Sequence, residues 1–265
     1  MRKQIAFIII VVNILSLTAL ASAEPLVIAA SPSLAVPLEA LGRAFESTHP
    51  NVRVQLYFDS ALDLRRTIAA MESTGKYFIG SGPIHLIAPG GTEVITRLEQ
   101  RYYVLPGTRR PYATASLVLV VPESLVEAPS SFEALAQDSR IRVAVADPKL
   151  TVVGQKTNEL LKALGIADAL KGRLDVATDV RGVIDHLLNG QADVGIIFGP
   201  DAYEQREHVR VVAVSSDKVD RPMVYSMAME RYCPNRALCE KFLAFMQSSE
   251  AQGVLKRLGY GIPGN

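Results

Sequence analysis

The sequence predicts an α/β protein with two lobes, each built from a largely parallel β-sheet that helices cover. Short apolar runs alternate with segments of helical periodicity along most of the chain. Two of the apolar runs, Ser116 to Val121 and Met223 to Met229, are placed to carry the chain from one lobe to the other and back. A chain of 265 residues is long enough to form two such lobes.

Residues 1–23 are predicted to be a signal peptide. The basic pair Arg2-Lys3 precedes an apolar segment, and Ala21-Ser22-Ala23 has the small-x-small form of a signal-peptidase site. Cleavage before Glu24 would leave an exported, periplasmic chain with 26 basic and 27 acidic residues, a net charge of −1. That balance argues against a nucleic-acid-binding protein. An uncleaved membrane anchor is the alternative.

Residues 24–112 and 224–265 are predicted to form the first lobe, and residues 113–223 the second. The first strand, Leu26 to Ala30, leads through Ser31-Pro32-Ser33 into a helix. A second alternating strand, residues 52–58, leads into a second helix through Asp59-Ser60. The remaining predicted elements are a short strand after Gly75, a helix starting at Val94 to Leu98, the crossing strand at 116–121, a short helix capped by Ser130 and Ser131, a strand from Ile141 to Ala146, a helix carrying Leu160, Leu161 and Leu164, a strand from Val209 to Val214, the returning strand at 223–229, and two C-terminal helices.

The stretch from Thr178 to Asp201 is the most informative for function. Apolar residues at helical spacing follow Thr178 and Asp179, either of which could be the N-cap, and Asn189-Gly190 ends this helix. A buried strand from Val194 to Phe198 follows. If the start of the helix and the end of the strand open onto one crevice, the helix N-terminus offers a site for an anion.

Cysteine and histidine placement indicates neither a metal site nor a catalytic site. Cys233 and Cys239 are close enough to pair in an oxidising compartment, and we expect a disulfide, with two free thiols as the alternative. The four histidines are scattered, without the spacing of metal ligands. No Gly-x-Ser-x-Gly elbow is present, so a hydrolase is disfavoured, and no cofactor is expected.

The order of the motifs resembles the periplasmic molybdate-binding proteins of ABC transporters, within the type II periplasmic binding proteins. The resemblance covers nearly the whole chain after residue 23. It rests on Val27 to Leu34, Phe58 to Leu64, Leu117 to Pro122, Val143 to Pro148 with Val153-Gly154, Asp179 to Gly182, Gly195 to Ala202, and Leu258 to Ile262. It implies a ligand cleft between the lobes, a monomer, and a membrane permease as partner.

In the family that this chain resembles, serine hydroxyls, backbone N–H groups and a tyrosine hydroxyl hold a tetrahedral oxyanion such as molybdate or tungstate. By position, Ser33 matches the first serine, and the amides of Val153 and Val180 match two backbone donors. Ala61, preceded by Ser60, stands where the family has its second serine, and Phe198 stands where it has the tyrosine.

The ligand site is therefore predicted at Ser33, Ser60, Ala61, Val153, Val180 and Phe198. Ser33 and Ser60 could instead be helix caps. Tyr77, Tyr203 and Tyr225 could each replace the missing tyrosine hydroxyl. The resemblance implies a solute-binding protein for a tetrahedral oxyanion; the alternatives are the same fold with another small ligand, or a sensor without a transport role.

Overall fold

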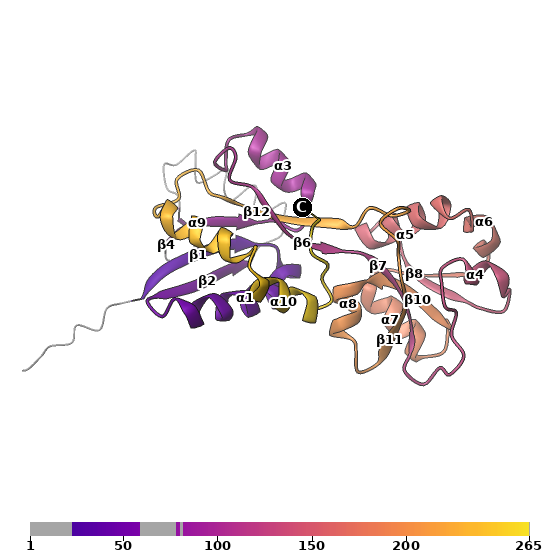
Figure 1. Ribbon diagram of the computed structural model, residues 1–265. Helices are drawn as coiled ribbons and strands as arrows, with labels where there is room; N and C mark the ends of the chain where they lie inside the picture. The colour runs from indigo at the N-terminus through magenta and orange to yellow at the C-terminus, as the bar shows by residue number, and fades with distance from the viewer. Residues whose placement is uncertain (1–22, 59–77, 80–81, 265) are drawn as a thin grey trace, which may run out of the picture.

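The computed structural model describes residues 23–58, 78–79 and 82–264. Figure 1 shows them as two lobes joined by chain segments that run between them. The predicted signal peptide and the predicted second helix, with Ser60 and Ala61, lie outside the described residues. No helix in the described part of the chain is long and apolar enough to cross a membrane.

Lobe 1 is built around a five-stranded sheet with the strand order β2-β1-β5-β12-β6. Strands β1, β2 and β5 are parallel, and β12 is antiparallel to both of its neighbours. Its elements are β1 (Glu24–Ala30), the short 3₁₀ helix η1 (Pro32–Leu34), α1 (Ala35–Thr48), β2 (Val52–Phe58), β5 (Leu86–Ala88), α3 (Thr92–Gln100), β6 (Arg110–Ala115), β12 (Met223–Met229), α9 (Arg236–Phe245) and α10 (Ser249–Arg257). Strands β3 (Phe78–Ile79) and β4 (Gly82–Pro83) form a separate pair.

Lobe 2 contains a second five-stranded sheet, with the order β11-β7-β10-β8-β9. Strands β10, β8 and β9 are parallel, whereas β7 is antiparallel to both β10 and β11. Its elements are β7 (Leu117–Pro122), α4 (Ala134–Gln137), β8 (Val143–Ala146), α5 (Val152–Ala163), α6 (Ala167–Leu170), β9 (Leu174–Ala177), α7 (Val180–Leu188), β10 (Val194–Phe198), α8 (Gly199–Glu204) and β11 (Val209–Val214). The predicted α/β class with two mixed sheets is confirmed.

Both faces of the first sheet are buried, as a sheet with parallel central strands requires. Leu26 and Ile28 of β1 belong to the large core that α1 and α10 help to cover. Ala29 points to the opposite face, where Ile87, Ile95 and Ala228 form a smaller core beneath α3. Successive side chains of β1 point to opposite faces of the sheet. Since both faces are buried, the strand is a continuous apolar run.

The chain passes between the lobes where β6 leads through Ser116 into β7, and again where it enters β12. The predicted lobe boundaries at residues 112–113 and 223–224 stay predictions; β6 runs across the first, and β12 begins at the second. The C-terminal tail also bridges the lobes. Gly261 exchanges backbone hydrogen bonds of 2.8 Å with Thr114 in β6, and Gly259 packs against the backbone of Gly199 in lobe 2.

The predicted disulfide is not formed in this structure, although a hydrogen bond joins the side chains of the two cysteines. Cys233 and Cys239 are both buried free thiols, and the Cys239 thiol lies 3.6 Å from the backbone carbonyl of His85, to which it donates. The spacing of the two cysteines was compatible with a bond but did not require one.

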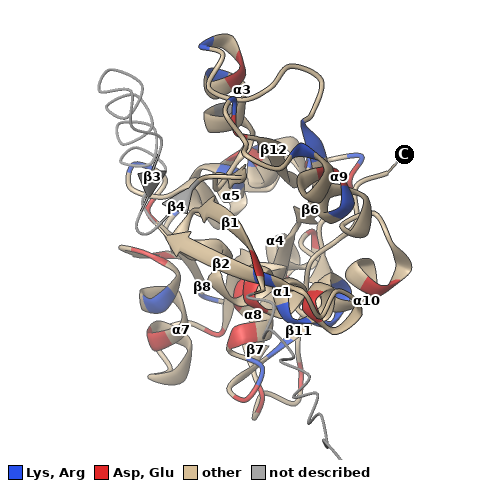
Figure 2. Cartoon of the chain, turned by 90° about the vertical axis from the view of Figure 1, so that its left-hand side faces the viewer, with Lys and Arg blue, Asp and Glu red and all other residues tan. Residues whose placement is uncertain are grey.

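Charged residues of both signs are interspersed over the described surface. Figure 2 shows blue and red segments together on α3 and on α7. This pattern agrees with the composition of the full sequence, which has 28 basic and 27 acidic residues.

Candidate ligand-binding cleft

A cavity of about 700 Å³ lies between the lobes. Ser33 and Gly90 line it from lobe 1, at the carboxyl ends of β1 and β5, and the rest of that wall consists of Met223 and Tyr225 of β12 and Tyr260 of the tail. The other wall comes from lobe 2, where the lining residues are Thr151, Val152, Val153, Asp179, Val180, Arg181, Ile184, Phe198, Pro200, Asp201, Glu204 and Gln205. Ligands of open α/β sheets bind at this place, outside the carboxyl ends of the strands.

Two lobe 2 helices begin at the cavity, and each leaves backbone donors free there. Thr151 caps α5 by accepting a hydrogen bond of 3.0 Å from the N–H of Gly154. Asp179 caps α7 in the same way, accepting a bond of 2.9 Å from the N–H of Gly182. Each cap satisfies the third amide of its helix, so the first two amides of each helix, which include those of Val153 and Val180, have no intrahelical acceptor. Their N–H groups and the two helix dipoles suit an anion.

Ser33 lies in η1, the turn between β1 and α1, and its side chain is exposed to the cavity. It caps neither helix: the residue before η1 is Ser31, which makes no capping hydrogen bond, and the residue before α1 is Leu34. The hydroxyl oxygens of Ser31 and Ser33 are 3.4 Å apart. Gly90 packs against this pair, since a Cβ there would lie 2.9 Å from the Ser31 hydroxyl oxygen. The Ser33 hydroxyl is therefore available to a ligand.

Phe198 ends β10 and is also the residue before α8, where its ring is 8% exposed at the cavity wall. Gly199-Pro200 ends the strand without opening into a loop. It instead begins a short helix, because proline is well tolerated in the first turn. Asp201, in that first turn, accepts a hydrogen bond from the backbone N–H of Phe198.

The electrostatics of the cavity are mixed. Burial raises the pKa of Asp201 to about 6, and the nearby charge of Glu204 adds to the shift. Asp179 brings a third carboxylate, and Arg181 is the basic side chain among the cavity-lining residues that the structure describes. Asp201 was not among the predicted site residues, because the sequence around it gives no sign that its side chain lines a cavity.

The predicted ligand residues fall into two groups. The structure brings Ser33, Val153, Val180 and Phe198 together around one cavity, whereas Ser60 and Ala61 lie outside the described residues. Among the tyrosines considered as replacements, Tyr225 lines this cavity and Tyr203 lines a different one; Tyr77 is outside the described part. Tyr260 was missed, although it lies within the tail motif Leu258 to Ile262.

A larger hollow of about 1020 Å³ lies in lobe 2, lined by residues such as Val126, Pro129 and Arg140. Ser33 does not line this hollow, and none of the described helices of eight or more residues begins at it. Within the described residues, no group of three or more histidine, cysteine, aspartate or glutamate side chains could hold a metal ion. The cleft between the lobes is therefore the stronger candidate site.

Two lobes with mixed sheets and a polar cleft between them define a periplasmic-type binding protein. Residues 26–261 match the family of bacterial extracellular solute-binding proteins, and the chain belongs to that family. The chain is 24% identical to the molybdate-binding protein ModA of Escherichia coli over 216 residues, which cover 80% of this chain and 83% of the relative. The predicted resemblance to the molybdate-binding proteins is confirmed.

Solved structures show the same fold. A substrate-binding domain of an ABC transporter from Clostridium difficile superposes with a TM-score of 0.80 at 22% identity, covering 91% of this chain and 99% of that chain. The periplasmic molybdate-binding protein of Azotobacter vinelandii superposes with a TM-score of 0.63 at 20% identity, covering 90% of this chain and all of that chain. These similarities assign the architecture.

Proposed function

We propose that this chain captures a small tetrahedral oxyanion outside the cytoplasm and delivers it to the permease of an ABC transporter. Molybdate and tungstate are the first candidates, because the relatives include proteins named for binding molybdate. One observation carries the proposal: the N-termini of α5 and α7 and the Ser33 hydroxyl all lie at the same cavity. Neutral donors at helix N-termini hold an anion without a compensating basic side chain.

Closure of the lobes is part of this proposal. A five-atom oxyanion fills only a small part of a cavity of about 700 Å³. The Ser33 hydroxyl comes from lobe 1, whereas the amides of Val153 and Val180 come from lobe 2. A ligand that contacts both walls must therefore draw them together, as hinge-closing binding proteins do. The protein acts as an exported monomer and carries out no catalysis in this scheme.

A second candidate is a binding protein of the same fold for a different small ligand. Phe198 favours it, because a phenyl ring offers no hydrogen bond to an oxyanion at a position where the resembled family has a tyrosine. The carboxyl groups of Asp201 and Glu204 in the same cavity favour it too, since they repel a dianion. A sensor that binds the same oxyanion without a transporter differs from the main proposal only in its partner.

A thermal-shift screen of the purified protein separates these candidates. A specific ligand at 100 times its dissociation constant stabilises the folded state by about 2.7 kcal/mol. For a chain of this size we expect the melting temperature to rise by roughly 5–10 °C with molybdate or tungstate. Sulfate, phosphate and small carboxylates serve as competitors. If no oxyanion stabilises the protein, the oxyanion proposal is wrong, and stabilisation by a carboxylate alone would support the second candidate.

Affinity for molybdate is expected to decrease as the pH rises through about 6. Below this value the Asp201 carboxyl is neutral, and above it the carboxylate repels the bound dianion, since its pKa in the folded protein is about 6. We expect a decrease of about tenfold between about pH 5 and about pH 8, the effect of one unit charge in a partly solvated cleft. Titration calorimetry with dilute molybdate measures it.

Asp201→Asn is expected to remove this pH dependence and to keep the higher affinity at neutral pH. The asparagine side-chain oxygen can still accept the hydrogen bond from the Phe198 N–H. Asp185→Asn is the matched control, because Asp185 is exposed on α7 and does not line the cavity. A pH dependence that persists unchanged in Asp201→Asn would assign it to another group.

A further inference from the structure

Two tyrosine residues that line the cleft are largely buried, and neither hydroxyl has a hydrogen-bond partner among the described residues. Tyr225 and Tyr260 are each only 7% exposed, and both line the cavity between the lobes. Neither hydroxyl takes part in any of the described hydrogen bonds. Unlike the hydroxyl of Tyr112, these two hydroxyls are not completely buried within the described part of the chain, so a ligand in the cavity can reach them.

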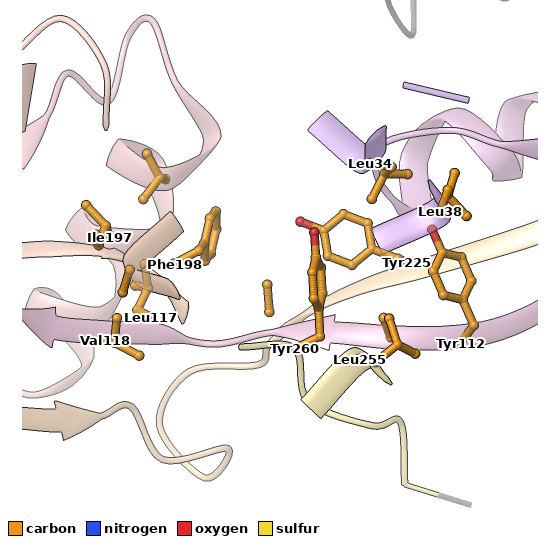
Figure 3. Packing of buried hydrophobic residues seen from close by; sticks show 14 of the residues in the cluster. Leu34, Leu38, Tyr112, Leu117, Val118, Ile197, Phe198, Tyr225, Leu255 and Tyr260 are labelled. Atoms are coloured by element: carbon orange, nitrogen blue, oxygen red, sulfur yellow. The ribbon is translucent and has the colours of Figure 1, made fainter. Parts of the chain in front are cut away.

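The two hydroxyls converge. Figure 3 shows both tyrosine hydroxyls side by side, at the ends of the rings that face the space between Phe198 and Leu34. The rings meet edge to face, with centroids 5.7 Å apart and an interplanar angle of 74°. An edge-to-face pair holds both rings in a fixed orientation. Two donors therefore open onto one point of the cleft.

Independent features of the backbone hold each tyrosine in place. The pairing of β12 with β6 shifts register between Tyr225 and Ser226, and such a bulge changes the direction in which a side chain points. Tyr260 follows Gly259, whose φ of +79° permits the sharp turn after α10. The backbone hydrogen bonds between Gly261 and Thr114 then fix the tail to β6. The backbone of each tyrosine is therefore placed independently, and the contact between the rings then fixes their orientation.

Both hydroxyls are protonated at neutral pH. Burial raises the pKa of Tyr225, and the negative charge of Asp201 raises it further. Burial also raises the pKa of Tyr260, with contributions from Tyr225, Asp201 and Glu204. A neutral phenol is a hydrogen-bond donor, whereas a phenolate would repel an anion. The pair is therefore suited to acceptor oxygens rather than to a cation.

We propose that the Tyr225 and Tyr260 hydroxyls bind the ligand from the lobe 1 side and supply the hydroxyl donors that Phe198 cannot provide. This inference rests on the proposed oxyanion function and names two further specificity-determining residues of that site. Together with Ser33 they give lobe 1 three hydroxyl donors, opposite the amides of Val153 and Val180 in lobe 2. The ligand is then an acceptor-rich anion with several oxygens, held by neutral donors on both walls.

The test compares Tyr225→Phe, Tyr260→Phe and the double variant with the wild-type protein by titration calorimetry with molybdate and tungstate. Each single change removes one hydrogen bond to a charged ligand, so we expect the affinity to decrease about 10- to 100-fold, and further in the double variant. The melting temperature without ligand should be unchanged, because the phenyl ring keeps the packing and neither hydroxyl takes part in a described hydrogen bond. Tyr203→Phe is the matched control, since Tyr203 lines another cavity.

A second readout separates ligand contact from a structural role. The chain has no tryptophan and 9 tyrosines, so its near-ultraviolet absorption reports on tyrosine. Molybdate should produce a tyrosine difference spectrum in the wild type that is lost in the double variant. Wild-type affinity in both single variants would overturn this inference and leave the oxyanion function standing. A wild-type protein that binds no oxyanion would overturn both.

Discussion

Gly154→Ala is expected to lower the free energy of unfolding by roughly 2–4 kcal/mol, the range of a severe overpacking change. Gly154 lies in the first turn of α5, where the helix packs on the end of β8. A Cβ at this position would lie 2.3 Å from the carbonyl oxygen of Ala146 and 2.7 Å from the backbone carbonyl carbon of Asp147. Both neighbours are backbone atoms, so no side chain can rotate away, and α5 must move instead.

Thermal and urea unfolding measure this change, and oxyanion binding should weaken with it because the amide of Val153 moves with α5. Gly253→Ala is the matched control. Gly253 lies within α10, and a Cβ there would meet only the end of the flexible Arg257 side chain, at 3.6 Å. Alanine is a better helix former than glycine by about 1 kcal/mol, so this variant should be more stable than the wild type. Equal stability of Gly154→Ala and the wild type would contradict the packing of α5 against β8.

Ser33→Ala is expected to weaken molybdate binding about 10- to 100-fold, by removing a hydrogen bond of about 1.5–3 kcal/mol to a charged ligand. The Ser33 hydroxyl caps no helix, and its neighbour within hydrogen-bonding range is the Ser31 hydroxyl at 3.4 Å. The folded state therefore depends little on it, and the melting temperature without ligand should stay within about 1 °C of the wild type.

Ser47→Ala is the control for Ser33→Ala. Ser47 is exposed on α1 and donates a hydrogen bond of 2.7 Å to the carbonyl of Ala44, away from the cavity. Its loss should change neither affinity nor stability appreciably. If Ser33→Ala binds molybdate as tightly as Ser47→Ala does, Ser33 is not a ligand of the site.

Strong hydrophobic patterns predicted most of the strands. Strand β11 was expected from Val209 to Val214 and has those bounds, because a short apolar run between polar segments has no competing interpretation. Strand β6 was missed, since Pro111 within it disfavours a strand. That proline is accommodated because β6 is an edge strand of its sheet, where a missing N–H need not break a ladder. Strand β9 was missed because it is only four residues long and lies at the other sheet's edge.

The candidate site was predictable where a proposed ligand group is a local feature of the backbone. The amide of Val180 lies at a helix start that Thr178 or Asp179 marks in the sequence, whereas the amide of Val153 was placed only by the resemblance to the family. Tyr225, Tyr260 and Asp201 are different, because they lie far apart along the chain and only the tertiary fold brings them to one cavity. A tyrosine in an apolar strand has the same pattern whether its hydroxyl meets a ligand or the core. The tail motif was a signal for Tyr260, but it indicated only the family.

The position of β12 between β5 and β6 has a consequence for the order in which the chain folds as it leaves a ribosome or a translocation channel. All strands of lobe 2 lie in the continuous segment from Leu117 to Val214, so that sheet can assemble as soon as this segment has emerged. The sheet of lobe 1 cannot assemble so early. Strand β5 has no partner on one side until residues 223–229 have emerged and pair with it as β12. Pairing over such a separation in sequence is slow. Until β12 pairs with it, the unpaired edge of β5 can pair with another chain or be recognised by a chaperone.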